Sequence, residues 1–401
     1  MRNIRKVTQD LYWIGSNDRR LSLFENVLPI SRGVSYNNYL LLDEKTCLFD
    51  TADAAVHLQF FENLAAALDG RKLDYLVVHH MEPDHCALIE DLLLRHPEVT
   101  IVTNNKVVNM IGQFFDLNLE GHLQLVNEGD TLNTGKHTLH FVNTPMVHWP
   151  EVMMSYDDCD KILFSADAFG TFGALNGNIF ADEFNFETEW LDDARRYYTN
   201  IVGKYGPQVQ MALKKASALD IKIICPLHGP VWRDNLSFYL KKYDLWSRYE
   251  PEEKGVLMVY GSMYGHTESA MESLATMLAE RGIRNIAMYD VSHTDVSILL
   301  SEAFRVSHIV VAAPTYNGNI YTPIESFLND LLIHNLQNRT YAVIENGTWA
   351  PQAAKGMRAI IEQMKNSSIL EPVLTIKSAI KQPQFAQAES LADAIVHSLK
   401  Q

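Results

Sequence analysis

The chain carries the stretch His79-His80-Met81-Glu82-Pro83-Asp84-His85 directly after a largely apolar run from Leu73 to Val78. A run of that length, rich in branched and aromatic residues and followed by a proline, is typical of a buried strand that ends in a loop. We therefore expect this stretch at the carboxyl end of a strand.

Four polar side chains of this stretch form a donor set for metal ions. In an extended segment, side chains two positions apart share a face and lie roughly 6.5 Å apart, so His80, Glu82 and Asp84 are expected to point the same way. His85 follows Asp84 directly, as expected where the backbone begins to turn. Two imidazoles and two carboxylates suit a pair of metal ions about 3.5–4 Å apart.

A solvated polar loop with a few histidines is the simpler interpretation, and the rest of the chain argues against it. Three more donors each follow a segment with the pattern of a strand. They are His148 after 138–142, Asp167 after 162–164 and His228 after 221–225. Four strand ends that all present His, Glu or Asp favour a common metal site.

The order His-x-Glu-x-Asp-His, followed by His148, Asp167 and His228, resembles the metallo-β-lactamase fold, whose hydrolases carry His-x-His-x-Asp-His. Glu82 stands where those hydrolases have a second histidine. The exchange adds a hard oxygen donor, which suits iron better than a zinc hydrolase site. Within that fold it is typical of the flavodiiron proteins, which the chain resembles over essentially its full length.

The resemblance implies two iron ions bridged by a hydroxide or oxo group and held by seven residues. These would be His80, Glu82 and His148 on one iron, Asp84, His85 and His228 on the other, and Asp167 as the bridge. Either His80 or His85 is able to swing away from the metal in this interpretation.

Composition and charge limit the other possibilities. Hydrophobic residues make up 47% of the 401 residues and charged residues 21%, as in ordinary globular proteins. The formal net charge of −15 argues against nucleic acid as a partner. No apolar run approaches the ~20 residues of a membrane helix, and the amino terminus lacks the apolar core of a signal peptide. We therefore expect a cytoplasmic protein without a membrane partner.

The four cysteines are scattered singly, with no Cys-x-x-Cys spacing. Disulfides are not expected in that compartment, and neither a rubredoxin-type iron site nor an iron–sulfur cluster fits this spacing.

The first part of the chain alternates short strands with helices. Apolar patterns predict strands at 11–15, 37–42, 46–50, 73–78, 99–102 and 138–142, and helices at 56–68, 88–94 and 105–115. Apolar residues at helical spacing from 187 to 205 predict one long helix. Its Tyr197 and Tyr198 are more often core residues than hydrogen-bond donors to a metal site.

A charged segment at 247–254 interrupts the apolar pattern and is expected to link two domains, residues 1–250 and 251–401. Strict alternation follows it, with strands at 256–260, 285–289, 309–313, 341–345 and 374–376 and helices at 268–281, 296–304, 323–332, 352–365 and 386–399. Five parallel strands with covering helices predict a doubly wound sheet of the flavodoxin kind. The fold class is thus α/β, with a metallo-β-lactamase-like αβ/βα sandwich followed by a flavodoxin-like domain.

Three loops at strand ends of the second domain predict a flavin site. The first leads into a helix, whose N–H groups and positive end suit a phosphate, and it lacks the lysine of a P-loop. The other two carry glycines and the aromatic residues Tyr316 and Trp349, which are suited to flank a planar ring. The candidate FMN contacts are Ser262, Met263, Tyr264, Gly265, His266, Thr267, Pro314, Thr315, Tyr316, Asn317, Gly318, Asn346, Gly347, Thr348 and Trp349.

A receiver domain of similar fold without flavin is the alternative for this half. It would need an acidic cluster after the first strand, where the chain has Ser262 to Thr267.

The resemblance implies an oxidoreductase that reduces dioxygen to water, nitric oxide to nitrous oxide, or both, with electrons relayed through FMN. Rubredoxin or another reduced donor would supply them from a separate molecule. The family also implies a head-to-tail homodimer, sometimes paired into a tetramer. Because rubredoxins are acidic, we expect a local basic or apolar docking patch on this acidic protein.

Two other functions remain open at this point. One is a binuclear hydrolase with a flavodoxin appendage, against which Glu82 argues. The other is a redox carrier or sensor with a structural metal site, against which the complete donor set argues.

Overall fold

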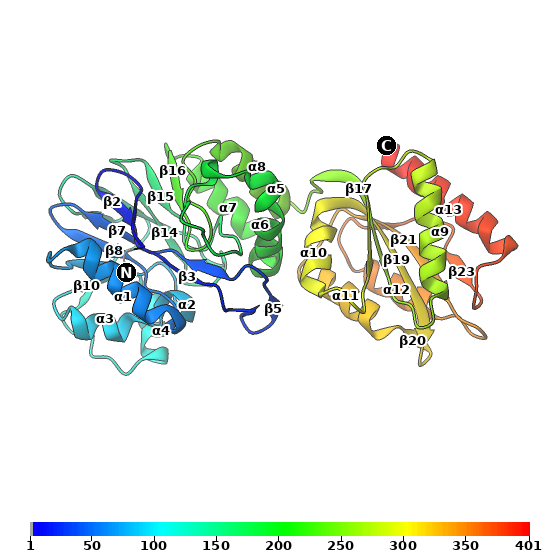
Figure 1. Ribbon diagram of the computed structural model, residues 1–401, viewed down its shortest axis with the longest axis horizontal. Coiled ribbons are helices and arrows are strands. Elements are labelled where there is room, and N and C mark those ends of the chain that lie inside the picture. Colours follow the sequence, from blue (N-terminus) through cyan, green and yellow to red (C-terminus); the bar gives the residue numbers. More distant parts are fainter. Residues whose placement is uncertain (1–2) are drawn as a thin grey trace. The chain divides into compact units, whose positions relative to one another are not determined.

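The computed structural model describes residues 3–401, which divide into two compact units (Figure 1). The first unit comprises the residues up to 198 together with 207–244, and the second comprises 199–206 and 245–401. A boundary at residue 250 between two domains stays a prediction.

The first unit contains two main sheets. Its strands are β1 (Arg5–Lys6), β2 (Leu11–Trp13), β3 (Ser16–Asp18), β4 (Leu23–Phe24), β5 (Leu28–Pro29), β6 (Val34–Tyr36), β7 (Tyr39–Leu42), β8 (Thr46–Phe49), β9 (Tyr75–Val77), β10 (Thr100–Thr103), β11 (Leu123–Leu125), β12 (Thr131–Asn133), β13 (Thr138–Asn143), β14 (Met153–Asp157), β15 (Ile162–Phe164) and β16 (Ile223–Cys225). One sheet has the order β1-β2-β7-β8-β9-β10-β11, the other β12-β13-β14-β15-β16, and two short ribbons pair β3 with β6 and β4 with β5.

Helices cover the outer sides of these sheets. They are α1 (His57–Leu68), α2 (Pro83–Cys86), α3 (Ile89–Arg95), α4 (Asn105–Phe114), α5 (Phe186–Glu189), α6 (Leu191–Tyr197), α7 (Gly206–Ala216) and α8 (Leu236–Ser247). In Figure 1, α1, α3 and α4 lie beside the first sheet, and α7 and α8 lie beside the second. The predicted αβ/βα sandwich is confirmed.

The long helix predicted at 187–205 is wrong, because this segment changes its winding several times. The helices α5 and α6 meet at Trp190, a π-helical segment covers Tyr198–Val202, and a 3₁₀ turn covers Gly203–Tyr205 before α7 begins. Gly203 and the Gly206-Pro207 pair are poor interior helix residues. Apolar spacing near 3.6 persists through such changes of winding, so the sequence pattern did not reveal them.

The second unit is built on one sheet in which parallel strands occupy five positions. Its strands are β17 (Glu253–Tyr260), β18 (Ile286–Asp290), β19 (Val306–Tyr316), β20 (Asn319–Ile320), β21 (Thr340–Asn346), β22 (Ser368–Ile369) and β23 (Leu374–Ile376). Its helices are α9 (His266–Glu280), α10 (Val296–Arg305), α11 (Thr322–Ile333), α12 (Ala353–Ile361) and α13 (Gln382–Lys400). The parallel order is β18-β17-β19-β21, followed by β22 and β23.

This unit has the doubly wound architecture that the alternation predicts. Helices α9 and α13 pack on one face of the sheet, and α10 and α11 lie on the other (Figure 1). The central strands are buried along most of their length, as expected for parallel strands covered on both faces. The fifth position is split between β22 and β23, and Pro372 in the interruption has no N–H for a ladder hydrogen bond.

Among residues 3–401, no helix combines the length and the apolar character needed to cross a membrane.

Arg339 holds together the backbone of the second unit. Its side chain is buried, and it donates hydrogen bonds to the carbonyl oxygens of Ala303 (2.9 Å), Phe304 (2.8 Å) and Tyr249 (2.7 Å). The first two carbonyls belong to the last turn of α10, which lacks helical partners for them. Burial lowers the pKa of Arg339 to about 10, so the guanidinium remains charged at neutral pH. It thus acts as a cationic cap on the carboxyl end of α10.

We expect Arg339→Met to lower the free energy of unfolding of this unit by about 3 kcal/mol, because several buried carbonyls lose their donors. The shift of the urea midpoint of the full chain measures the effect. Arg358→Met is the control, since Arg358 forms surface ion pairs with Glu371 (2.7 Å) and Glu362 (3.7 Å), whose loss is expected to cost under about 1 kcal/mol. Equal midpoint shifts in the two variants would contradict the role assigned to Arg339.

Candidate metal centre and flavin pocket

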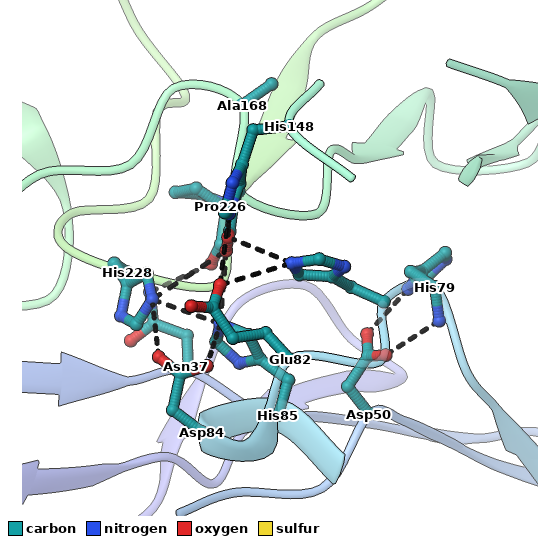
Figure 2. A network of polar contacts seen from close by, with 12 residues as sticks. Asn37, Asp50, His79, Glu82, Asp84, His85, His148, Ala168, Pro226 and His228 are labelled. Carbon is teal, nitrogen blue, oxygen red and sulfur yellow. Dashed lines mark hydrogen bonds and ion pairs between the residues drawn. The ribbon is translucent and has the colours of Figure 1, made fainter. Parts of the chain in front are cut away.

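The seven predicted metal donors come together in the first unit (Figure 2). Strand β9 leads into the loop that bears His80 and Glu82, and α2 bears Asp84 and His85. The other three donors stand in loops that follow strands of the second sheet. They are His148 after β13, Asp167 after β15 and His228 after β16. The site therefore lies where strand ends of both sheets meet.

The prediction that Asp84 continues an extended segment with His80 and Glu82 is wrong. Residues 83–86 form the helical turn α2, with Pro83 at its first position and Glu82 as the residue that precedes it. Proline suits that position because its fixed φ is helical and no N–H is needed there. The turn directs Asp84 and His85 away from His80 and Glu82, so the donors divide into two groups.

The first group consists of His80, Glu82, His148 and Asp167. The Oε2 atom of Glu82 lies 3.3 Å from Nε2 of His80 and 3.0 Å from Nε2 of His148. Oδ2 of Asp167 lies 3.1 Å from the same His148 nitrogen. Two imidazole nitrogens and two carboxylate oxygens thus surround one point.

The second group consists of Asp84, His85 and His228. The Nε2 atoms of the two histidines lie 3.0 Å apart, and the carboxylate of Asp84 approaches them at 3.5 Å and 3.3 Å. Figure 2 shows His228, Asp84 and His85 facing this common point. Both oxygens of Asp84 are buried and accept no hydrogen bond. A buried carboxylate without donors is costly unless a cation sits against it.

Asp167 lies between the two groups. Its Oδ2 faces His148, and its Oδ1 lies 3.1 Å from Nε2 of His85 and 3.7 Å from Nε2 of His228. One carboxylate with an oxygen toward each group is the arrangement by which a carboxylate bridges two metal ions.

The electrostatics of the site favour positive charge. Burial lowers the pKa of His148, but hydrogen bonds to Asp167 and Glu82 outweigh it and raise the pKa to about 9. Burial likewise lowers the pKa of His85, and the charges of Asp84 and Asp167 raise it to about 9. For Asp167, burial raises the pKa, while the neighbouring histidines bring it well below its usual value. Two metal cations would supply the charge that protons otherwise supply, so the residues fit a binuclear centre.

Groups behind the histidines fix some of the rings more firmly than others. His80 donates from Nδ1 to Oε1 of Glu151 at 2.8 Å, and His228 donates from Nδ1 to the carbonyl of Ser35 at 2.8 Å. Glu151 also accepts the N–H of Met81 at 3.0 Å. Nδ1 of His85, in contrast, is buried and has no hydrogen-bond partner. Such partners orient a metal-binding imidazole and raise its basicity. No sequence pattern marks Glu151, which lies in a loop without a donor motif.

His79, the first residue of the motif, binds to protein groups instead of facing the donors. Its Nδ1 donates to Asp50 at 2.6 Å, its backbone N–H donates to the same carboxylate at 2.7 Å, and Nε2 lies 2.8 Å from Oγ of Ser155. Figure 2 shows Asp50 beside His79, to one side of the donor groups. Asp50 follows β8 of the first sheet and Ser155 belongs to β14 of the second, so His79 anchors the motif to both sheets.

Tyr197, a candidate from the sequence, lies beside the second donor group. Its ring centroid is 5.6 Å from that of His228, and its hydroxyl is buried without a hydrogen-bond partner. Burial, followed by the charges of Asp167 and Glu82, holds the pKa of this hydroxyl well above its usual value, so it remains a donor. A buried hydroxyl without a partner is costly, which indicates that it serves a group bound in the site.

A third cluster, His137 with Asp157 and Asp160, is already closed by ion pairs. Both ring nitrogens of His137 are engaged, Nδ1 with Asp157 at 2.9 Å and Nε2 with Asp10 at 3.3 Å. This cluster stabilises the fold and offers no vacant histidine nitrogen to a metal.

The second unit contains a pocket of about 550 Å³ at the carboxyl ends of β17, β19 and β21. All the predicted flavin contacts except Gly265 line it, and Ala350, Gln352 and Ser378 line it as well. Gly265 has a φ of +85° and turns the chain into α9, a conformation that glycine adopts without strain. Pockets of this size suit a cofactor with a planar ring.

Hydrogen bonds tie the pocket loops to one another. Asn346 donates from Nδ2 to Thr267 at 3.3 Å and to the carbonyl of Ser378 at 2.8 Å, and Thr315 accepts the N–H of Gln352 at 2.9 Å. Ser378 escapes prediction from the sequence because the loop after β23 carries no glycine or aromatic signal. With the amino end of α9 for a phosphate and the rings of Tyr316 and Trp349 at the rim, the pocket fits FMN.

Two family models match the chain. Residues 34–229 match the ODP family beta lactamase model, and residues 258–390 match the flavodoxin model. The anaerobic nitric oxide reductase flavorubredoxin of Aeromonas hydrophila is 30% identical over 350 residues, which cover 86% of this chain and 70% of that protein. An uncharacterised protein of Methanocaldococcus jannaschii is 29% identical, with 94% of each chain covered.

Solved structures agree with these matches. The rubredoxin oxygen:oxidoreductase of Desulfovibrio gigas superposes with a TM-score of 0.92 at 27% identity, covering 99% of this chain and 98% of that one. Each unit of the chain therefore has a counterpart in the same solved chain.

We expect Glu151→Gln to weaken metal binding about 10- to 100-fold, because His80 loses its charged hydrogen-bond acceptor. The backbone N–H of Met81 keeps an acceptor, since the glutamine side chain still offers an amide oxygen. Titration of metal-free protein against a chelator of known affinity measures the change. Glu128→Gln is the matched control, since Glu128 is exposed and pairs with Lys215. Unchanged affinity in Glu151→Gln would contradict the positioning role of Glu151.

Proposed function

Because the chain belongs to the flavodiiron family of oxidoreductases, we propose that it reduces dioxygen, nitric oxide or both at a diiron centre, with electrons relayed by FMN. The centre would be held by the seven donors of the first unit, and the flavin by the pocket of the second unit.

The observation that carries this proposal is the pair of donor groups that share Asp167. Glu82, Asp84 and Asp167 bring three negative charges, which nearly balance two divalent cations. The set of three carboxylates and four imidazoles is rich in oxygen donors for a site of this fold, and such a set favours iron over zinc. Iron held by these donors would supply redox chemistry toward a diatomic gas, and FMN held in the pocket of the second unit would allow electrons to pass singly or in pairs.

The chain's own residues prepare the site for this chemistry. Glu151 and the carbonyl of Ser35 orient His80 and His228. Tyr197 holds a proton on a buried hydroxyl beside His228, where a hydrogen bond to bound substrate would satisfy it. Both proposed reductions consume protons as well as electrons, so a donor that keeps its proton at neutral pH suits the site.

The two alternatives are less well supported. Hydrolysis has no use for a flavin pocket, and a hydrolase of this fold would have histidine at position 82. A carrier or sensor with a structural metal would not need the buried hydroxyl of Tyr197, which has no hydrogen-bond partner and whose ring lies beside His228.

The electron donor, assembly and location follow from the family resemblance as further parts of the proposal. We propose rubredoxin or another separate reduced donor, a head-to-tail homodimer of the kind that is sometimes paired into a tetramer, and a cytoplasmic location. Mass determination of the purified protein in solution tests the assembly, and a monomer at working concentration would exclude it.

We expect the reduced protein, loaded with FMN and iron, to be reoxidised rapidly by dioxygen, by nitric oxide, or by both in separate stopped-flow experiments. Asp167→Ala removes the bridging carboxylate and is expected to abolish rapid reoxidation. Asp234→Ala is the control, because Asp234 is an exposed loop residue. Slow, equal flavin reoxidation in wild type and Asp167→Ala would exclude the metal centre as the catalyst and favour the hydrolase or carrier.

We expect Tyr197→Phe to keep its iron and flavin but to react about 10- to 100-fold more slowly with gas, the usual value of a hydrogen bond to a charged group. Iron content and stopped-flow rates of the same preparation measure the two effects. Tyr156→Phe is the control, since that hydroxyl donates to the carbonyl of Asp220 at 3.0 Å instead. A normal gas reaction in Tyr197→Phe would show that the hydroxyl is only a core group.

A further inference from the structure

The loop at 347–352 carries Trp349 at the rim of the flavin pocket and holds it mainly through the backbone. Trp349 lines the pocket, yet it is 90% exposed, so its ring has little packing of its own. The loop is tightly closed, because a Cβ atom added to Gly347 would lie only 2.8 Å from Cα of Pro351. Whatever fixes the backbone of this loop therefore also fixes the ring.

Side chains from two neighbouring strand ends hold the far end of this loop, where α12 begins. Thr315 at the end of β19 accepts the N–H groups of Gln352 at 2.9 Å and Ala353 at 3.3 Å. Glu345 near the end of β21 accepts the N–H of Ala354 through Oε2 at 2.9 Å. N–H groups at a helix start have no carbonyl partner within the helix, and the side chain of Gln352 does not cap this one. Glu345 therefore caps α12 from outside the helix.

Glu345 also binds the next strand of the sheet. Its Oε1 accepts the hydroxyl of Thr375 in β23 at 2.9 Å, and β23 leads to Ser378, which lines the pocket. The side chain of Glu345 is buried, and it is not among the described residues that line the pocket. One buried carboxylate behind the pocket wall thus joins the start of α12 to β23.

We propose that Glu345 is a positioning residue for the flavin, which fixes the start of α12 and the loop before it so that Trp349 stands beside the planar ring of the cofactor. A carboxylate suits this place because the amino end of a helix carries partial positive charge. The inference rests on the FMN part of the function proposed above, and it does not depend on which gas the protein reduces.

Titration of FMN into the flavin-free full chain, followed by quenching of flavin fluorescence, tests this role. Glu345→Ala is expected to weaken FMN binding about 10-fold, because two buried hydrogen bonds are lost, and to change the visible circular dichroism of the bound flavin. Glu345→Gln is expected to bind FMN within about threefold of wild type, because its amide offers an acceptor to Ala354 and a donor to Thr375.

Glu362→Ala is the matched control for Glu345→Ala. Glu362 follows the last residue of α12, is exposed and pairs with Arg358 at 3.7 Å. This variant is expected to leave both FMN affinity and the flavin spectrum unchanged.

A double-mutant cycle with Trp349→Ala tests whether Glu345 acts through the loop. In the Trp349→Ala background, Glu345→Ala is expected to weaken FMN binding by less than about threefold, because the ring that it positions is absent. An undiminished loss in that background would overturn the route through Trp349.

Thr375→Val covers the case in which Glu345→Ala fails to fold, since it removes one hydrogen bond to Glu345 and keeps the size of the side chain. It is expected to weaken FMN binding several-fold. Wild-type affinity and flavin spectrum in a folded Glu345→Ala, or in Thr375→Val where Glu345→Ala does not fold, would show a purely structural role and overturn the proposal. A wild-type chain that binds no FMN would instead contradict the flavin part of the proposed function.

Discussion

The structure of the first unit depends on placing three carboxylates and four imidazoles in one buried site. Ionised groups are expensive to bury unless opposite charge lies against them, so the site is stable only with cations or protons between its donors. In the absence of metal, the neighbouring carboxylates raise the pKa values of His85 and His148, so these histidines carry the protons that balance the charge. Rigid support is then needed to keep the donors apart, and Glu151, Ser35 and Asp50 provide it.

The sequence predicted the fold class, and it also pointed to the seven candidate donors that the structure brings together, because each stands next to a segment with a clear strand pattern. His228 and Asp167 are examples, each placed by an apolar run that ends in small residues or proline. What the sequence did not show depends on local winding. The turn at Pro83 to Cys86 produces the two donor groups that the family resemblance implies, whereas a count of alternate positions alone places Asp84 with His80 and Glu82.

Residues that act by orienting another residue could also not be predicted from the sequence pattern. Glu151 and Ser378 lie in loops and form hydrogen bonds with His80 and Asn346, and the residues next to them in the sequence show no pattern that indicates a functional role. Fourteen of the fifteen residues predicted as flavin contacts line one pocket, because glycines and aromatics gather in short loops at strand ends, a pattern that the doubly wound sheet requires. Gly265 acts on the backbone instead of lining the pocket.

The flavin pocket offers hydroxyls, amides and the amino end of α9, and no lysine or arginine is among its described lining residues. A phosphate there would be held by short hydrogen bonds and by the partial charges of a helix end instead of by a mobile cation. Dissolved ions weaken attraction between full charges far more than they weaken short hydrogen bonds. We therefore expect cofactor retention in this protein to depend on loop geometry and to be comparatively insensitive to the ionic strength of its surroundings.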